Sequence, residues 1–233
     1  MTWTQPVKEI ILVEEKKEID EEKKEIDEKK KKPVIPGISV QKKKERFKTA
    51  VIPAVNSVYA ELMERYQKVA DAIAAGADLT EFSALAKECR AETTEELLMA
   101  LKPHPRSIAI AQAAIESSWA TSRFFKEANN TFGIWSFNQN EARIAAGEKR
   151  GDKTIWIKKY DSIEASVRDY YRTLARGNAY KEFRNLKMET NNPYELVKKL
   201  DYYSEKGIEY GRELAEIIQF NKFETYDQQQ IAL

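Results

Sequence analysis

The segment from Ser107 to Glu116 constrains the fold of this chain more than any other. It reads Ser-Ile-Ala-Ile-Ala-Gln-Ala-Ala-Ile-Glu, and only Gln112 and Glu116 interrupt the small and aliphatic residues after Ser107. Alanine and isoleucine at these positions predict a helix that is apolar nearly all round, which is typical of a helix buried in a core. We therefore expect a fold built around a central helix with one carboxylate near its end.

Glu116 is the candidate for chemistry in this segment. It lies four residues after Gln112, so the two side chains share one side of the helix. Burial disfavours the charged form of a carboxyl group and raises its pKa. A carboxylic acid that keeps its proton near neutral pH can protonate the leaving-group oxygen of a glycosidic bond. The alternative is a solvated glutamate at a helix end, which on residue type alone is the commoner case.

Several separated motifs around this helix form a recognisable series. Ala-Gln-Ala-Ala-x-Glu-Ser-x-Trp at 111–119 is followed by Ser-Arg-Phe at 122–124 and Asn-Asn-x-Phe-Gly-Ile at 129–134. Lys-Tyr-Asp-Ser with Asp-Tyr-Tyr at 159–171, and Tyr-Ser-Glu-Lys-Gly with a further tyrosine at 203–210, continue it. Over about residues 46–226 the series resembles the bacterial glucosaminidase family. It is most similar to the Bax-type branch, which is related to the flagellar peptidoglycan hydrolases.

This resemblance implies both a fold and an activity. The implied fold is mainly α (α+β): a lysozyme-like helical domain with a short β-hairpin lobe. The implied activity is endo-β-N-acetylglucosaminidase cleavage of peptidoglycan glycan strands, at the β-1,4 bond after N-acetylglucosamine. Tyr203 matches the C-terminal tyrosine of the family and is expected to orient the sugar, although it could equally belong to the core.

The chain departs from the family pattern at two positions. The family often has Glu-Ser-Gly-Trp-Gly, and here Ser118 and Ala120 stand in place of the glycines. Both residues are small enough for close packing. A position that needs a positive φ would nevertheless be strained by them.

The second catalytic group is left open by the sequence. Glu141, Glu148 and Asp152 all fall in the region expected to face Glu116. Alternatively, the N-acetyl group of the substrate assists and the enzyme needs one carboxylate. Aromatic faces pack on the C–H surfaces of sugars, although each aromatic residue could instead belong to the core. The expected substrate-binding residues are Gln112, Trp119, Asn130, Phe132, Trp135 and Tyr160.

Composition argues against several other classes of function, namely nucleic-acid binding, catalysis by a thiol or a serine triad, and zinc binding. The net charge of +1 argues against strong non-specific binding to nucleic acid. Cys89 is the single cysteine and His104 the single histidine. A thiol nucleophile or a serine triad would need His104, which lies between prolines, and zinc sites recruit several such ligands. No metal site and no cofactor are expected, and the oligomeric state cannot be predicted.

The expected location follows from the substrate. Peptidoglycan implies the cell envelope or periplasm. Yet no stretch of about twenty apolar residues could span a membrane, and the N-terminal residues show no secretory signal.

The chain divides into four expected regions. Residues 1–40 are a charged spacer in which Glu-Glu-Lys-Lys-Glu-Ile-Asp occurs at 14–20 and again at 21–27. Residues 41–106 form a helical region that packs on the catalytic part, with helices at about 42–75, 80–89 and 94–101. Residues 107–226 are the glucosaminidase-like catalytic domain, and residues 227–233 are a tail.

Within the catalytic part the sequence predicts two strands, at 132–137 and 154–160. The polar stretch 138–153 between them is expected to be a loop. A helix is expected to start at Asp161, another at 192–195, and a last one over 207–219. Beyond it, Phe220 and Phe223 are expected to hold the tail.

Three other functions remain open. A muramidase or a lytic transglycosylase could use the same fold and the same glutamate. A catalytically silent glycan-binding module is compatible with Ser118 and Ala120. A helical scaffold tethered through the charged N-terminus is the third, although a scaffold does not need the downstream motifs.

Overall fold

The structure is a computed structural model that describes residues 39–150 and 153–229. The charged repeat, Asp152 and residues 230–233 lie outside this part of the chain. The remainder forms one compact unit that begins at Val40. This unit is mainly helical, and its described strands form a two-stranded antiparallel sheet, which confirms the expected fold class.

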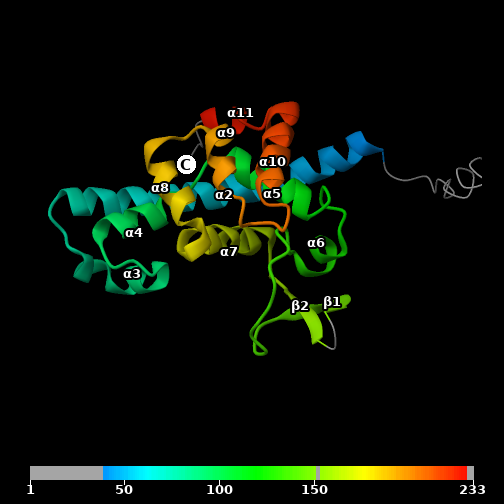
Figure 1. The fold of residues 1–233 in the computed structure, drawn as a ribbon, viewed down its shortest axis with the longest axis horizontal. Coiled ribbons are helices and arrows are strands. Elements are labelled where there is room, and N and C mark those ends of the chain that lie inside the picture. Colours follow the sequence, from blue (N-terminus) through cyan, green and yellow to red (C-terminus); the bar gives the residue numbers. More distant parts are fainter. Residues whose placement is uncertain (1–38, 151–152, 230–233) are drawn as a thin grey trace, which may run out of the picture. The chain divides into compact units, whose positions relative to one another are not determined.

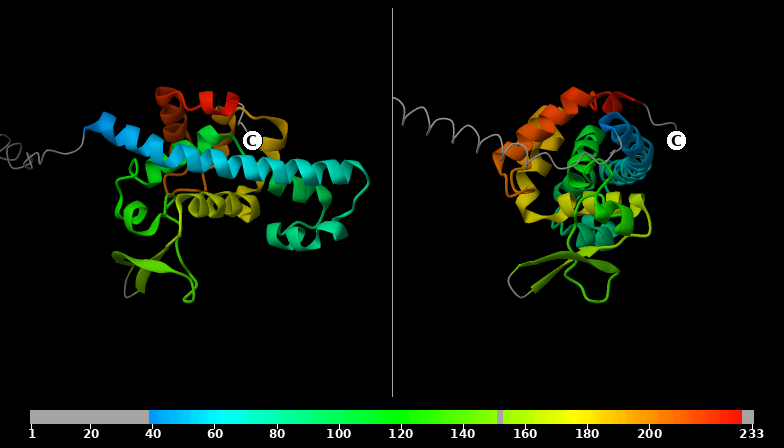
Figure 2. Two further views of the ribbon diagram at one scale, coloured as in Figure 1. Left: turned by 180° about the vertical axis from the view of Figure 1, so that it is seen from behind. Right: turned by 90° about the vertical axis from the view of Figure 1, so that its right-hand side faces the viewer.

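The longest element is α2 (Val40–Ala74), which runs along the whole helical body (Figure 2). Its buried face includes Phe47, Val51, Val55 and Val58, at spacings of four and three residues. This face contacts helices α4, α5 and α7. The helix predicted over 42–75 is confirmed, and no described helix is long and apolar enough to cross a membrane.

Three short helical segments follow α2 and pack against its C-terminal half. They are η1 (Leu79–Phe82), α3 (Ser83–Cys89) and α4 (Thr94–Leu101). Thr93 caps α4, because its hydroxyl accepts a hydrogen bond from the Glu96 amide at 3.2 Å. Val69, Leu97 and Leu101 form a small core here. Both helices predicted in this region are confirmed.

Helix α5 (Arg106–Glu116) lies at the centre of the unit (Figure 1). Every residue from Arg106 to Ala114 is buried. It contacts α2 together with α10 (Ile208–Asn221) and α11 (Thr225–Gln228). The helix that is apolar nearly all round is therefore the central one, as its composition predicts.

The remaining helices surround α5. They are α6 (Arg123–Ala128), α7 (Ile163–Arg176), η2 (Asn178–Tyr180), α8 (Lys181–Glu189), α9 (Pro193–Leu196) and η3 (Val197–Lys199). The prediction that Asp161 starts α7 is wrong by one residue. The cap is Ser162, whose hydroxyl accepts from the Ala165 amide at 3.2 Å. Asn192 caps α9 as expected.

The sheet is a hairpin of β1 (Arg143–Arg150) and β2 (Lys153–Lys158), in which Ala145 pairs with Trp156. The strand predicted at 132–137 is wrong, and β1 lies inside the expected loop. Residues 132–137 contribute only an isolated bridge, from Trp135 to Ile157. The reason is a turn at Gly133, with φ of 66°, which interrupts the extended backbone that the aromatic composition favours.

The C-terminal end is more ordered than predicted. The last helix, predicted over 207–219, is α10 and extends to Asn221, and α11 at Thr225–Gln228 reaches into the expected tail of 227–233. Phe223 is fully buried, whereas the Phe220 side chain is 81 % exposed, so Phe220 does not anchor the end of the chain by burial. Aspartate and tyrosine side chains in α11 supply contacts that composition alone does not reveal. Asp227 accepts from the Ser107 amide at 2.9 Å.

Candidate active site around Glu116

Glu116 is the last residue of α5, and an unusual turn ends the helix there. Ser118, Trp119 and Ala120 have φ of 51°, 58° and 59°, three successive residues in the left-handed region. The Ser117 hydroxyl stabilises the turn, since it accepts from the Ala120 amide at 2.8 Å and donates to a helix carbonyl at 2.6 Å. Glu116 is thereby held half-buried at the edge of the core.

Three parts of the chain meet at the Glu116 carboxyl group. Its Oε1 accepts a hydrogen bond from the Tyr210 hydroxyl of α10 at 2.9 Å. Its Oε2 faces Gly133, where a Cβ atom would lie 3.9 Å from it. The motif at 129–134 and the motif ending at Tyr210 therefore converge on the glutamate of the first motif.

A chain of hydrogen bonds leads from the core to Glu116. The Tyr170 hydroxyl donates to Gln112 Oε1 at 2.5 Å, and Gln112 Nε2 donates to the Tyr210 hydroxyl at 3.1 Å. Tyr210 in turn donates to Glu116. Each group in this chain donates a hydrogen bond to the next one, and the chain fixes the orientation of the Glu116 side chain. Gln112 and Glu116 lie on one side of α5, as their spacing predicts.

Burial raises the pKa of Glu116 above its ordinary value, and the negative charge of Glu213 adds to this effect. The hydrogen bond from Tyr210 and the positive charge of Lys206 act in the opposite direction without cancelling it. Lys206 and Glu213 are themselves paired at 2.6 Å. Glu116 thus keeps its proton to a higher pH than an exposed glutamate, which suits a proton donor.

Asn130 fixes the loop that passes over Glu116. Its side-chain nitrogen donates to the carbonyls of Ile134 and Lys158, both at 2.9 Å, and its oxygen accepts from the Ile134 amide at 3.0 Å. Phe132 stacks on Tyr170, with ring centroids 4.0 Å apart. These contacts place Gly133 beside the carboxyl group and connect the loop to β2.

Three of the predicted substrate-binding residues are buried. Gln112 is fully buried, and Asn130 and Phe132 are 1 % and 3 % exposed. Their contacts are with Tyr170, Tyr210 and backbone groups of the loop and of β2, as described above. In this structure the three side chains support the site from inside the core, and a ligand that approaches from the solvent does not reach them.

The other predicted contacts lie in different surroundings. Trp119 packs edge-on against Phe47 at 5.2 Å, with Lys44 over its ring. Trp135 is 39 % exposed, on the segment beside β2. The Tyr160 hydroxyl donates to Asp169 at 2.8 Å. Of these residues, Trp135 presents the most accessible aromatic face.

The structure describes the side chain of only one of the three candidate second carboxylates. Glu141 Oε1 accepts from the Ser136 hydroxyl at 2.7 Å, and its Oε2 lies 3.7 Å from the Lys158 ammonium group. Glu148 belongs to β1, but its side chain is outside what the structure describes. Asp152 lies outside the described residues altogether.

Tyr210, and not Tyr203, is the tyrosine that contacts Glu116, which the sequence analysis did not predict. Tyr203, the predicted catalytic tyrosine, is half-buried and stacks on Tyr210, with centroids 5.5 Å apart. Within the described residues the Tyr203 hydroxyl has no hydrogen-bond partner, whereas that of Tyr210 contacts Glu116 directly. Both tyrosines occur in the same motif. The sequence signal that favours Tyr210 is its spacing of four residues from Leu214, which puts Tyr210 on the buried face of α10.

Several known proteins are similar to this chain. Protein bax from Escherichia coli (strain K12) is 28 % identical over 124 residues, which are 51 % of this chain and 43 % of that protein. The chain therefore matches less than half the length of this curated relative.

Two solved structures are similar in fold. A peptidoglycan hydrolase from Sphingomonas sp. A1 matches with a TM-score of 0.45 and 19 % identity, over 60 % of this chain and 93 % of that chain. The catalytic domain of the autolysin Auto from Listeria monocytogenes matches with a TM-score of 0.46 and 24 % identity, over 69 % of this chain and 96 % of that chain.

A comparison with protein-family profiles matches a continuous part of the chain. The sequence profile of the glucosaminidase family, described as mannosyl-glycoprotein endo-beta-N-acetylglucosaminidase, matches residues 91–223. This range includes α5, the loop over Glu116, the hairpin and Tyr210, and it makes up more than half of the chain. The chain belongs to the glucosaminidase family of glycoside hydrolases.

Proposed function

We propose that the protein hydrolyses the glycan strands of peptidoglycan at the β-1,4 bond after N-acetylglucosamine, with Glu116 as the general acid. The observation that carries this proposal is the raised pKa of a half-buried carboxyl group that contacts Tyr210 and faces Gly133. Family membership supports the class of reaction. The names of the similar hydrolase and autolysin support the substrate.

In this proposal the acidic proton of Glu116 is on Oε2, on the side of Gly133. The hydrogen bond that Oε1 accepts from Tyr210 supports this placement. In the proposed step this proton passes to the glycosidic oxygen while its bond to the anomeric carbon breaks. Water then supplies the hydroxyl group of the new reducing end and returns a proton.

The second group is proposed to come from the hairpin side or from the substrate. Glu141 lies 3.7 Å from the Lys158 ammonium group, and a carboxylate on this side of the site could stabilise the oxocarbenium-like transition state. Glu148 is the competing residue on β1. If the substrate N-acetyl group assists instead, neither carboxylate is essential. Trp135 and Tyr203 are proposed to contact the sugar rings.

The proposed substrate also gives the proposed partner and location. Glycan strands of the cell envelope are the expected partner, and no nucleic acid is expected. Catalysis would therefore take place in the envelope or periplasm.

The test is digestion of purified sacculi, followed by mass spectrometry of the new ends. N-acetylglucosamine at the reducing ends is the expected product. N-acetylmuramic acid there would indicate a muramidase, and anhydro-muramic acid a lytic transglycosylase. Sacculi that bind the protein but release nothing would indicate a glycan-binding module and would contradict the proposal.

Single substitutions separate the candidate second groups. Glu141→Gln and Glu148→Gln each remove one carboxylate and keep the side-chain size. Loss of activity in one variant identifies that residue, and unchanged activity in both supports assistance by the substrate. Glu127→Gln is a matched control, because Glu127 is an exposed residue of α6 that pairs with Arg123.

A further inference from the structure

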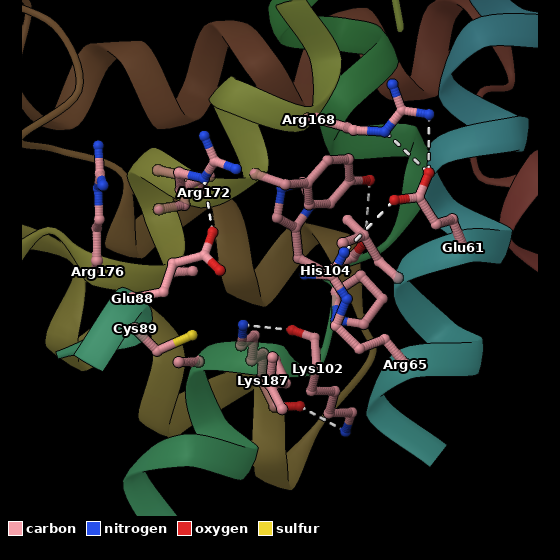
Figure 3. A pocket seen from close by; sticks show the side chains of 17 residues that line it. Glu61, Arg65, Glu88, Cys89, Lys102, His104, Arg168, Arg172, Arg176 and Lys187 are labelled. Carbon is pink, nitrogen blue, oxygen red and sulfur yellow. Dashed lines mark hydrogen bonds and ion pairs between the residues drawn. The ribbon is translucent and has the colours of Figure 1, made fainter. Parts of the chain in front are cut away.

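A cavity lies between α2, α3, α4, α7 and α8 (Figure 3). It is separate from the site of Glu116, because His104 lines it just before α5 begins and Glu116 is at the other end of that helix. A helix of this length spans about 16 Å. We call it the Lys187 cavity, after the buried lysine in its wall.

The Lys187 cavity accepts only a small molecule. Its volume is about 70 Å³, and one water needs roughly 10–15 Å³ on this measure. It therefore has room for several waters or one small organic molecule, and is too small for a glycan strand. Leu62, Leu101, Tyr171 and Leu174 provide an apolar part of the wall.

The wall of the cavity carries an excess of positive charge. Its acidic residues are Glu61 and Glu88, and each is already paired: Glu61 with Arg168 at 2.8 Å and Glu88 with Arg172 at 3.0 Å. The basic residues are Arg65, Lys102, Arg168, Arg172, Arg176 and Lys187. Among the described residues no carboxylate pairs with Lys102, Arg176 or Lys187. The cavity thus favours an anion.

Lys187 is the charged group that most needs such a ligand. It is 3 % exposed, and its ammonium group donates to the Lys102 carbonyl at 2.5 Å. The Lys102 ammonium group donates back to the Lys187 carbonyl at 2.7 Å, as Figure 3 shows. Burial, Arg184 and Lys102 lower the pKa of Lys187 to about 7. A buried ammonium group without a counter-ion is costly, and a bound anion would offset this cost.

His104 adds a second requirement on the ligand. Its Nδ1 lies 3.0 Å from the Pro105 carbonyl oxygen, which can only accept, so the proton is on Nδ1. Nε2 is therefore an acceptor, and it is buried without a partner among the described residues. A molecule in the cavity that carries a hydroxyl group would complete this hydrogen bond.

We propose that the Lys187 cavity binds a small hydroxy-carboxylate, with its carboxylate toward Lys187 and its hydroxyl toward His104. The carbon skeleton lies against the apolar wall. Neither the glycosidase reaction nor Glu116 takes part in this binding. The cavity is therefore a ligand site in addition to the proposed active site.

The test is calorimetric titration of the full chain with lactate as the probe. Lactate is expected to bind one to one, with a Kd on the order of 1 mM. Lactamide has the same shape without the charge, and acetate lacks the hydroxyl group. Both are expected to bind at least about tenfold more weakly, in keeping with the loss of a charge-assisted contact or a hydrogen bond.

Variants connect the binding to the cavity. His104→Phe removes the Nε2 acceptor, keeps a ring that can stack on Tyr171 and leaves the contact between the two lysines intact. It is expected to weaken lactate binding about tenfold, to the affinity of acetate. Arg46→Gln removes an exposed arginine of α2 outside the cavity and is the control. Glu116→Gln is expected to bind lactate as the wild type does. Lys187→Met is expected to abolish binding while the variant remains folded.

Several results would overturn the proposal. They are absence of lactate binding up to about 50 mM, equal affinity for lactamide, and equal effects of His104→Phe and Arg46→Gln. Tighter binding of inorganic phosphate than of lactate would show that the site takes another class of anion and would contradict the proposed carboxylate. Since His104→Phe retains Lys187, the test remains decisive even if Lys187→Met fails to fold.

Discussion

At the scale of single residues, the hydroxyl of Tyr210 sets the behaviour of Glu116. It is the one hydrogen-bond donor described for the carboxyl group, and it lowers a pKa that burial raises. The same hydroxyl accepts from the buried Gln112. Tyr210 therefore contributes both to the acidity of Glu116, the proposed general acid, and to the stability of the core.

Tyr210→Phe tests this double role. Without the donor, the pKa of Glu116 rises further, so the limb of the pH–rate profile on which the protonated acid is lost moves to higher pH. The variant also leaves Gln112 with an unpaired donor, at a cost of about 1–3 kcal/mol in the free energy of unfolding. Tyr203→Phe is the control and should shift neither quantity. A basic limb that moves to lower pH would contradict the assignment.

Glu116 itself should reduce stability at neutral pH. Its pKa is higher in the folded chain than the ordinary 4.5, so the folded state is disfavoured once the group ionises. The stability is fully present below pH 4.5 and is lost as the pH rises through the folded pKa. Glu116→Gln should therefore be at least as stable as the wild type at pH 7, by chemical denaturation. A clear destabilisation at pH 7 that disappears at pH 4 would contradict this.

At the scale of elements, the turn after α5 carries strain. Ser118, Trp119 and Ala120 are in the left-handed region, which costs a residue other than glycine about 1–2 kcal/mol. The departures from the family pattern noted in the sequence fall on the first and third of these residues. The sequence predicted strain there if φ were positive, and it is positive at both.

Ser118→Gly and Ala120→Gly should each stabilise the protein. Glycine relieves the strain but loses more entropy on folding, so the net gain is about 1 kcal/mol for each site. Ala84→Gly is the matched control, because Ala84 is an exposed residue in the regular helix α3 and should cost about 1 kcal/mol. Thermal unfolding measures both effects. Destabilisation by all three glycines would show that the turn is not strained.

Periodicity predicted the helices well and the sheet poorly. The buried face of α2 and the all-round burial of α5 each appear as a pattern of apolar residues within one stretch of sequence, so they can be predicted locally. The position of β1 depends on how Asn130 and Gly133 turn the loop toward Glu116, which is a tertiary effect. The aromatic residues at 132–137 favour a strand, but Phe132 is used to stack on Tyr170 instead.

The proposed general acid was predictable from the sequence and its hydrogen-bond partner was not. Glu116 could be found because an isolated carboxylate in an apolar helix is unusual. Choosing Tyr210 over Tyr203 required knowing which hydroxyl reaches across from α10. The Lys187 cavity has no sequence signal, since its lining comes from five separate helices and from the loop before α5.

At the scale of the whole unit, two buried basic groups make stability depend on pH. The pKa of Lys187 is about 7 in the folded chain and near 10.5 in an unfolded one. The unfolded chain therefore binds more protons between these values, and the free energy of unfolding rises with pH across this window. His104, with a folded pKa of about 3 against 6.5, acts in the same direction between those values.

Lys187→Met isolates the lysine contribution. The stability of the wild type relative to this variant should rise as the pH increases from 7 to about 9. The folded chain holds Lys187 without its proton in this range, and the free-energy cost of that deprotonation relative to the unfolded chain falls as the pH rises. Urea denaturation at several pH values measures this difference. Lys68→Met, at an exposed position on α2, should keep the slope of the wild type. A difference between wild type and Lys187→Met that does not change with pH would show that Lys187 is not buried as a charge.

The central claim is that one buried acid donates the proton that cleaves the glycan, and its most direct test is the rate of sacculus hydrolysis by Glu116→Gln. The glutamine keeps the hydrogen bond to Tyr210 but has no proton to give. The release of reducing ends should fall about 10²–10⁴-fold, while binding to sacculi and thermal stability are retained. A rate within about tenfold of the wild type would contradict the account.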